Sequence, residues 1–186
     1  MTRPEMLALL SSWLSGDRLS HSLESEAMAR SLAIAHGEDP QRAATAALLH
    51  DLCRCKSEGW QLAYLARQSQ PLSEEWRHSP QLWHGLCASV YLRRELGVRD
   101  KGILDAVRYH TTGRPGMRAL EKIVYLADKA EASRDYPKAD ELRALAYRSL
   151  DEAMRFAQRE ILAWQCKKGY PLVKEAITAY NYYQKG

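Results

Sequence analysis

The chain has 186 residues, of which 46% are hydrophobic and 27% are charged. This length suits one domain with a substantial core, and Lys and Arg only slightly exceed Asp and Glu (27 against 23), so neither a nucleic-acid-binding stripe nor a strongly acidic surface is indicated. No apolar stretch reaches the roughly 20 residues of a membrane-spanning helix, and no apolar signal core follows a basic start. We therefore expect a cytoplasmic protein with neither a nucleic-acid nor a membrane partner.

Two helices are predicted at the start of the chain. The first runs from about Pro4, which suits an opening turn, to the break at residues 15–17. The second begins near Ser20 and ends at His36, because the following Gly37 can adopt the left-handed conformation that ends many helices.

The third predicted helix is the most apolar. Asp39 is its expected N-cap and Pro40 its first residue. His50 and Asp51 lie near its end, directly after a run of alanines and leucines. A polar pair is costly to bury in such a run unless something binds it, and a buried aspartate needs a cation or several donors. We therefore interpret His50 and Asp51 as a candidate metal-binding pair.

The rest of the chain also shows helical spacing. Helices are predicted over residues 59–68, 81–96, 100–110, 117–132, 140–164 and 172–183. Period-two alternation is not sustained over a strand length, so the expected fold class is all-α. We expect one domain over residues 1–186, with a core of about 18–132 and C-terminal helices in 138–185 packed on it.

Four further residues of metal-ligand type fall near helix ends or on a buried helix face: His21, His84, His110 and Asp128. Helix ends can meet at one mouth of a bundle, and imidazole with carboxylate suits Fe, Mn or Zn, or a bridged pair of ions. His36, beside a helix stop, is better explained by the dipole of its helix and His78 as a loop residue, so both are excluded.

The cysteines do not indicate a metal or disulfide framework. Cys53, Cys55, Cys87 and Cys166 are too few for a disulfide scaffold and form no C-x-x-C pair. We expect reduced, mostly buried thiols. A zinc knuckle built on Cys53 and Cys55 is the disfavoured alternative, because the usual spacing of structural zinc ligands is absent.

Five segments together resemble a known family. They are Arg-Leu-Ser-His-Ser at 18–22, Leu-Leu-His-Asp-Leu-Cys-Arg at 48–54, His-Gly at 84–85, Tyr-His-Thr-Thr-Gly at 109–113 and Tyr-Leu-Ala-Asp-Lys-Ala-Glu at 125–131. In this order they resemble the YqeK family of HD-domain phosphohydrolases, whose members are symmetrical diadenosine tetraphosphate hydrolases. The similarity extends from about His21 to the C-terminal helix.

The resemblance implies a helical HD domain with an asymmetric pair of metal ions, usually iron, with Mn or Zn as alternatives. One ion would be held by His21, His50, Asp51 and Asp128, and the other by His84 and His110, with Asp51 bridging. A hydroxide shared by the two cations would attack an inner phosphorus of the tetraphosphate and release two molecules of ADP.

Basic side chains near the ligands are expected to stabilise the transition state. We predict Asp51, Arg54 and Lys129 as catalytic residues, and Arg54, Lys129 and Arg134 as phosphate contacts. Thr111 and Gly113 could let hydroxyl and backbone groups approach a phosphate or ribose, although Gly113 could equally be a helix stop.

Other functions remain open from the sequence. The same ligand set suits an HD phosphohydrolase acting on a nucleoside monophosphate, a deoxynucleotide or a cyclic dinucleotide. A non-catalytic metal- or nucleotide-binding regulator is the other alternative, although a complete set of six ligands favours a catalyst. Tyr180, Tyr182 and Tyr183 could pack the last helix or form a homodimer contact.

Overall fold

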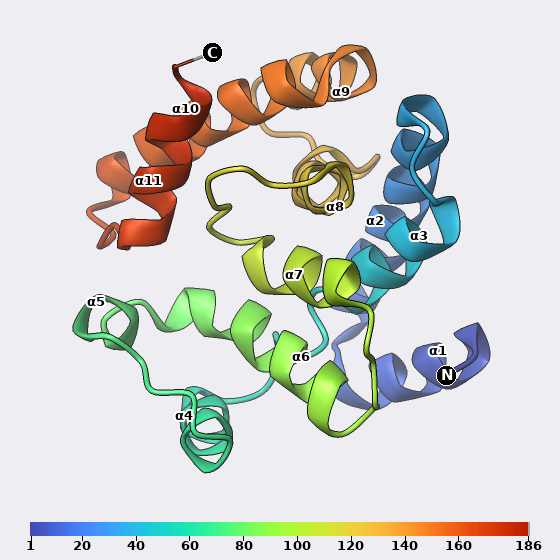
Figure 1. Cartoon of the computed structure of the whole chain (residues 1–186), viewed down its shortest axis with the longest axis vertical. Helices are drawn as coiled ribbons and strands as arrows, with labels where there is room; N and C mark the ends of the chain where they lie inside the picture. The colour runs from blue at the N-terminus through green and yellow to red at the C-terminus, as the bar shows by residue number, and fades with distance from the viewer. Residues whose placement is uncertain (186) are drawn as a thin grey trace.

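The computed structural model describes residues 1–185, and every regular element in that range is helical (Figure 1). The elements are α1 (Arg3–Trp13), α2 (Gly16–His36), α3 (Pro40–Leu49), α4 (Glu58–Arg67), α5 (Glu74–Arg77), the 3-10 helix η1 (Pro80–Leu82), α6 (Trp83–Arg94), α7 (Lys101–Tyr109), α8 (Ala119–Ala130), α9 (Ala139–Arg148), α10 (Leu150–Lys168) and α11 (Lys174–Tyr183). Over the described residues, no helix combines the length and the apolar character needed to cross a bilayer. The all-α prediction is confirmed.

Helix α8 lies at the centre of the molecule and is seen almost end-on in Figure 1. Helices α2, α3, α7, α9 and α10 pack around it. The sequence predicted one buried face, but each of residues 123–127 is 0% exposed, so this part of the helix is buried on all sides. The central helix therefore carries Asp128 into the interior of the bundle.

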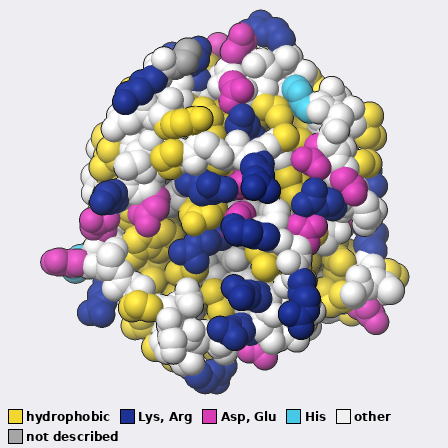
Figure 2. Space-filling model, in the orientation of Figure 1, with side chains coloured by type: hydrophobic (Ala, Val, Ile, Leu, Met, Phe, Trp, Pro, Cys, Tyr) yellow, Lys and Arg dark blue, Asp and Glu magenta, His cyan; other side chains and the backbone are white. Residues whose placement is uncertain are grey.

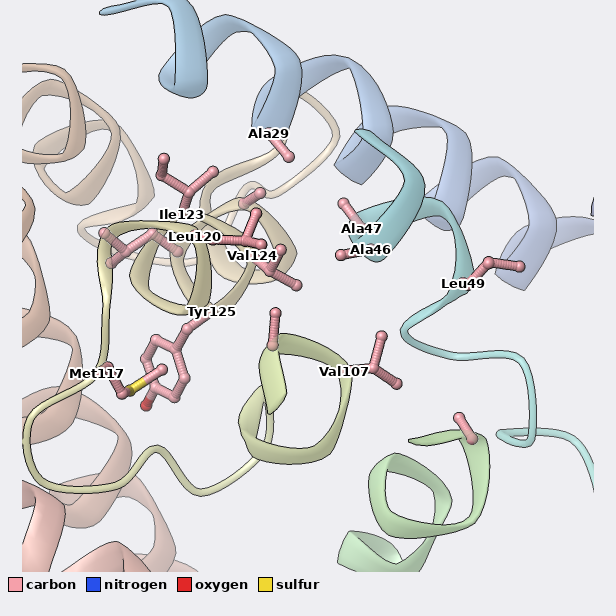
Figure 3. Close-up of a cluster of buried hydrophobic side chains, with 14 of the residues drawn as sticks. Ala29, Ala46, Ala47, Leu49, Val107, Met117, Leu120, Ile123, Val124 and Tyr125 are labelled. Atoms are coloured by element: carbon pink, nitrogen blue, oxygen red, sulfur yellow. The ribbon is translucent and has the colours of Figure 1, made fainter. Parts of the chain in front are cut away.

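Small side chains allow α2, α3 and α8 to approach closely. Ala29 of α2 and Ala46 and Ala47 of α3 lie beside Ile123 and Val124 of α8 (Figure 3), and all five are fully buried. Because alanine adds little volume between backbones, the three helices can pack closely against one another. This unit supplies three of the segments that carry the candidate metal ligands.

The second helix begins earlier than predicted. Its N-cap is Ser15, whose backbone is extended, and the helix starts at Gly16 rather than near Ser20. Asp17 lies in the first turn, where its charge complements the helix dipole. His21 is therefore in the second turn and does not open the helix.

Helix α3 has the predicted beginning and a slightly earlier end. The Asp39 side chain accepts hydrogen bonds from the backbone N–H groups of Gln41 and Arg42. The helix ends at Leu49, so His50 and the residue after it occupy the turn that follows. His50 and Asp51 therefore follow the last residue of the helix and do not lie inside it.

The predicted helix over 140–164 is wrong, because the chain bends at Ser149. This residue is extended, with φ −157° and ψ 116°, and separates α9 from α10. Its hydroxyl accepts a hydrogen bond from the backbone N–H of Glu152 and so caps α10. The short helix α5 was also not predicted. Helices α9 and α10 both pack directly on α8, and α11 packs on α10. The predicted domain limits, a core of about 18–132 with C-terminal helices in 138–185, stay a prediction.

Asp100 links two helices and gives a test of the packing. It caps α7 by accepting from the N–H groups of Gly102 and Ile103, and it forms a two-point ion pair with Arg42 of α3. The hydrogen bond from Arg42 is the main cause that lowers the pKa of Asp100 from 3.8 to about 2.

Replacing Asp100 by alanine is expected to lower the free energy of unfolding by about 1–2 kcal/mol in urea titrations, since a cap contributes about 1 kcal/mol and a half-exposed ion pair less than that. Asp100→Asn keeps the cap and loses the charge, so its free energy of unfolding should lie between those of the wild type and of Asp100→Ala. Because the folded pKa is depressed, the ion pair contributes above the unfolded pKa and is lost as pH falls from about 4 to about 2. An equal pH dependence for wild type and Asp100→Asn would contradict this assignment.

Candidate metal centre

The structure brings the six predicted metal ligands to one place in the bundle. They come from α2 (His21), the turn after α3 (His50 and Asp51), α6 (His84), the end of α7 (His110) and α8 (Asp128). Three overlapping groups have ligand atoms within 4.8 Å of one another: His21 with His50 and Asp51, His50 with His110 and Asp128, and Asp51 with His84 and His110. Among the described residues, the candidate metal-binding groups contain no cysteine. All four cysteines are free, but only Cys53 and Cys87 are buried, whereas Cys55 and Cys166 are exposed, so the expectation of mostly buried thiols is wrong for two of them.

Asp51 lies between two sets of imidazoles. Its Oδ1 is 3.1 Å from His84 Nε2 and 3.7 Å from both His110 Nε2 and His50 Nε2. A carboxylate has two oxygens and can bind two cations, whereas a neutral imidazole has one nitrogen with a free lone pair and binds one cation. The position of Asp51 therefore suits the bridging role that the sequence predicted for it.

Asp128 approaches the cluster from the central helix. Its Oδ1 is 3.0 Å from His21 Nε2 and 3.7 Å from His50 Nε2. Together with Asp51, it places two carboxylates against four imidazoles in a site where five of the six residues are less than 9% exposed.

Charge in this buried site is set by the neighbours of each group. Burial would raise the pKa of Asp51, but His50 and the other histidines outweigh it and hold the pKa well below its usual value. Asp128 is similarly held ionised against burial, mainly by Lys129. Burial lowers the pKa of His110 to about 4, so this imidazole is neutral near pH 7. Ionised carboxylates and neutral imidazoles are the states that bind metal ions.

The orientation of His50 is the observation that tests whether these residues fit a metal ion. Its Nδ1 donates to the carbonyl of Ala47, so in the neutral imidazole Nε2 carries a lone pair that faces Asp51 and Asp128. This Nε2 is buried and has no hydrogen-bond partner among the described residues. Burial lowers the pKa of His50, but Asp51 and Asp128 outweigh it and raise the pKa, which means that the site attracts positive charge. An unpaired lone pair facing two carboxylates fits a bound cation.

Glu131 orients His21 and was not predicted from the sequence. Its Oε1 lies 3.2 Å from His21 Nδ1, and the carboxylate is 1% exposed. Ser133 fixes it through its backbone N–H and hydroxyl. A carboxylate that accepts from the far nitrogen of a histidine fixes the tautomer and strengthens the imidazole as a ligand. Glu131 follows Asp128 by one helical turn, and that spacing was the available signal.

Replacing Glu131 by glutamine is expected to weaken metal binding roughly 10- to 100-fold, as is typical when such a supporting carboxylate is lost. The measurement is metal occupancy after dialysis against a series of buffered chelators. Glu152→Gln, in an exposed residue of α10, is the matched control. Equal occupancy in the two variants would show that Glu131 does not support the metal ligands.

Basic side chains surround the two carboxylates. Arg18 Nη1 lies 3.5 Å from Asp51 Oδ2, and Arg134 Nη2 lies 3.1 Å from Asp128 Oδ1. Arg54 donates to the carbonyl of Gln81 and lines the same cavity. Arg18 was missed, although it precedes His21 by one helical turn. These guanidinium groups make the surroundings of the cluster suitable for anionic ligands.

Lys129 is held by the protein itself. Its Nζ donates to the carbonyl of His110 and to Asp128 Oδ2, at 2.8 and 3.0 Å, and lies 3.7 Å from the centre of the Tyr125 ring. Burial lowers the pKa of this ammonium group. An ammonium group has three N–H donors, so a phosphate contact would have to replace one of these interactions.

The cluster opens into a cavity of about 1200 Å³. Asp51, His84, His110 and Asp128 line it, together with five basic side chains: Arg18, Arg54, Lys56, Lys129 and Arg134. Figure 2 shows Lys and Arg side chains gathered over the middle of one face of the molecule, with acidic and hydrophobic groups between them. The cavity is large enough for an extended anionic ligand.

The two predicted ligand-contacting residues after His110 have different positions. Thr111 lines the cavity, and its buried Oγ1 has no partner among the described residues. Gly113 lies outside the cavity lining and packs against α10 and α11. Its φ is +69°, and a Cβ there would lie 2.4 Å from the side-chain nitrogen of Gln158. The position is explained by the turn and the close packing, so the prediction of a substrate contact at Gly113 finds no support in this geometry.

The two excluded histidines lie away from the cluster. His36 donates to the carbonyl of Ala146 in the last turn of α9, and His78 is an exposed residue at the end of α5.

Comparison with known proteins identifies the family of the chain. The model of the HD domain family matches residues 18–133, and the chain belongs to that family. Over 186 residues it is 36% identical to the symmetrical bis(5'-nucleosyl)-tetraphosphatase of Bacillus subtilis, with 100% of both chains covered. It is 32% identical to the enzyme of the same name from Halalkalibacterium halodurans, over 97% of this chain and 96% of the other. The resemblance found in the sequence is thereby confirmed.

A solved structure has the same fold. An HD superfamily hydrolase from Clostridium acetobutylicum, described as involved in NAD metabolism, superposes with a TM-score of 0.96 and 30% sequence identity, covering 100% of this chain and 98% of that one.

Proposed function

We propose that the protein hydrolyses diadenosine tetraphosphate symmetrically to two molecules of ADP. The observation that carries this is the position of Asp51, shared by two groups of imidazoles at a cavity lined by basic side chains. A hydrolase of a long polyphosphate needs both features, because four phosphates must be held while one bond is broken. The names of the relatives at 36% and 32% identity supply the substrate class.

The proposed cofactor is a pair of metal ions, most suitably iron, with Mn or Zn as alternatives. His21, His50, Asp51 and Asp128 would hold one ion, and His84 and His110 the other, with Asp51 common to both. When bound, such a pair activates a water molecule and neutralises phosphoryl oxygens. Elemental analysis of the untreated protein tests the count and the element.

The side chains of the cavity then have separate tasks in the proposed reaction. Arg18, Arg54 and Arg134 would bind the phosphate chain and stabilise the negative charge that develops on it. Lys129 would fix Asp128 and the carbonyl of His110, and Thr111 would donate its unpaired hydroxyl to a phosphate oxygen.

Product analysis tests the proposed reaction. Hydrolysis in ¹⁸O-labelled water should give ADP as the only nucleotide product, with the label on the terminal phosphate of one ADP in each pair. Formation of AMP and ATP would contradict the symmetrical cleavage, and failure to consume the substrate with full metal occupancy would contradict the proposed function.

Another nucleotide substrate is the second candidate. It is favoured by the link to NAD metabolism stated for the Clostridium acetobutylicum protein. The substrate panel should therefore include NAD-related nucleotides, nucleoside monophosphates, deoxynucleotides and cyclic dinucleotides. A cytoplasmic location and a homodimer stay predictions, which cell fractionation and sedimentation would test.

A further inference from the structure

Helix α10 gives the cavity an apolar wall. Phe156, Ile161 and Trp164 line the cavity from one side of this helix, and Tyr170 follows them in the chain. The Trp164 and Tyr170 rings meet edge to face, with centroids 5.4 Å apart. Trp164 is 51% exposed and Tyr170 is 43% exposed. Exposed aromatic surface in a cavity that also contains basic side chains suits stacking with a flat, uncharged ring.

Gln165 adds a polar group beside this aromatic pair. The residue lines the cavity but is only 8% exposed. Its side-chain oxygen has no hydrogen-bond partner among the described residues. A buried acceptor without a donor is unfavourable, so a ligand that supplies an N–H group at this position would remove that cost.

We propose that Trp164, Gln165 and Tyr170 form a subsite for a purine base, with adenine as the preferred occupant. Adenine presents an amino donor next to ring-nitrogen acceptors, and a primary amide offers the matching acceptor and donor. The inference rests on the proposed function and extends it, because it assigns the place of one of the two bases. The basic and metal-binding groups of the cavity would hold the phosphates of the same nucleotide.

Gln165→Glu tests which base the amide selects. A carboxylate can only accept, so it loses the bond to an adenine ring nitrogen, whereas guanine offers it two N–H donors on one edge. In calorimetric titrations of the metal-loaded protein, we expect the Kd for ADP to rise roughly tenfold and the preference to shift toward GDP. Inorganic pyrophosphate reports any general effect of the added charge. Gln41→Glu, at an exposed position on α3, is the matched control.

Trp164→Ala tests the stacking surface. The Kd for ADP should rise roughly tenfold while the Kd for pyrophosphate is unchanged, because only the base loses its contact. Tyr182→Ala removes an aromatic residue of equal exposure (51%) that does not line the cavity, and it should change neither value. The subsite would be overturned if the Trp164 or Gln165 variant lost affinity for ADP and for pyrophosphate equally, or if its affinity for ADP did not change.

The two proposals can fail separately. If diadenosine tetraphosphate is not cleaved but ADP binding depends on Trp164 and Gln165 as described, the subsite stands and the proposed reaction does not. If the substrate is cleaved and both variants bind ADP like the wild type, the reaction stands and the subsite does not.

Discussion

Replacing Asp51 by asparagine is expected to lower kcat for diadenosine tetraphosphate at least about a thousandfold, because a metal pair contributes several kcal/mol of transition-state stabilisation and each ~1.4 kcal/mol is tenfold in rate. Asparagine keeps the size of the side chain, so the close packing of α3 and α8 is preserved. It removes the negative charge and leaves one acceptor oxygen where three imidazoles now approach a carboxylate. Steady-state kinetics and metal analysis of the same preparation measure both effects.

Metal occupancy tests whether Asp51 is shared by both ions. If it is, the Asp51→Asn variant should bind both metal ions more weakly and lose more than one metal ion per chain. Loss of a ligand to one ion alone would leave the other ion bound. Asp151→Asn, at a 68% exposed side chain paired with Lys122, is the control and should keep wild-type occupancy and kcat. An Asp51→Asn protein with wild-type turnover would exclude this carboxylate from the reaction.

Three of the six candidate metal ligands could be picked out because they break a hydrophobic pattern. His50 and Asp51 stand at the end of an apolar helix, where a polar residue has a visible cost, and Asp128 lies on a helix that is otherwise buried. The helix boundaries were less predictable. Ser149 lies inside a pattern that reads as one continuous helix, and only its conformation shows that the hydroxyl caps a new one.

The supporting residues could not be found in the same way. Glu131 reaches a histidine 110 positions away in the chain, and no local pattern encodes that contact. Arg18 and Glu131 each lie one turn from a ligand, but charged residues at such spacing are usually solvated. Gln165 has ordinary helical context, and only its burial without a partner distinguishes it. A sequence pattern can show that a polar residue lies on the buried face of its own helix. The roles of Arg18, Glu131 and Gln165 instead depend on contacts between different helices, which the local sequence does not encode.

Arg134→Ala is expected to lower kcat/KM roughly a hundredfold without loss of metal, which is the typical effect of removing one fixed donor from a developing anion. The guanidinium group donates to the carbonyl and to the Oδ1 of Asp128, and its Nη2 lies 3.4 Å from His21 Nε2. It is a cation beside two presumed metal ligands, so its removal should not weaken metal binding. Retained metal would separate this effect from loss of a ligand.

A second variant tests whether the planar shape of the Arg134 guanidinium group matters in addition to its charge. Arg134→Lys keeps the charge but cannot donate in two directions from one plane, so it should recover only part of the lost kcat/KM. Arg148→Ala, at a 70% exposed side chain paired with Glu152, should behave like the wild type. If Arg134→Lys is as active as the wild type, then the charge alone matters and the fixed orientation seen against Asp128 has no role. If Arg134→Ala loses metal together with activity, the residue acts by stabilising the metal centre and not by contacting phosphate.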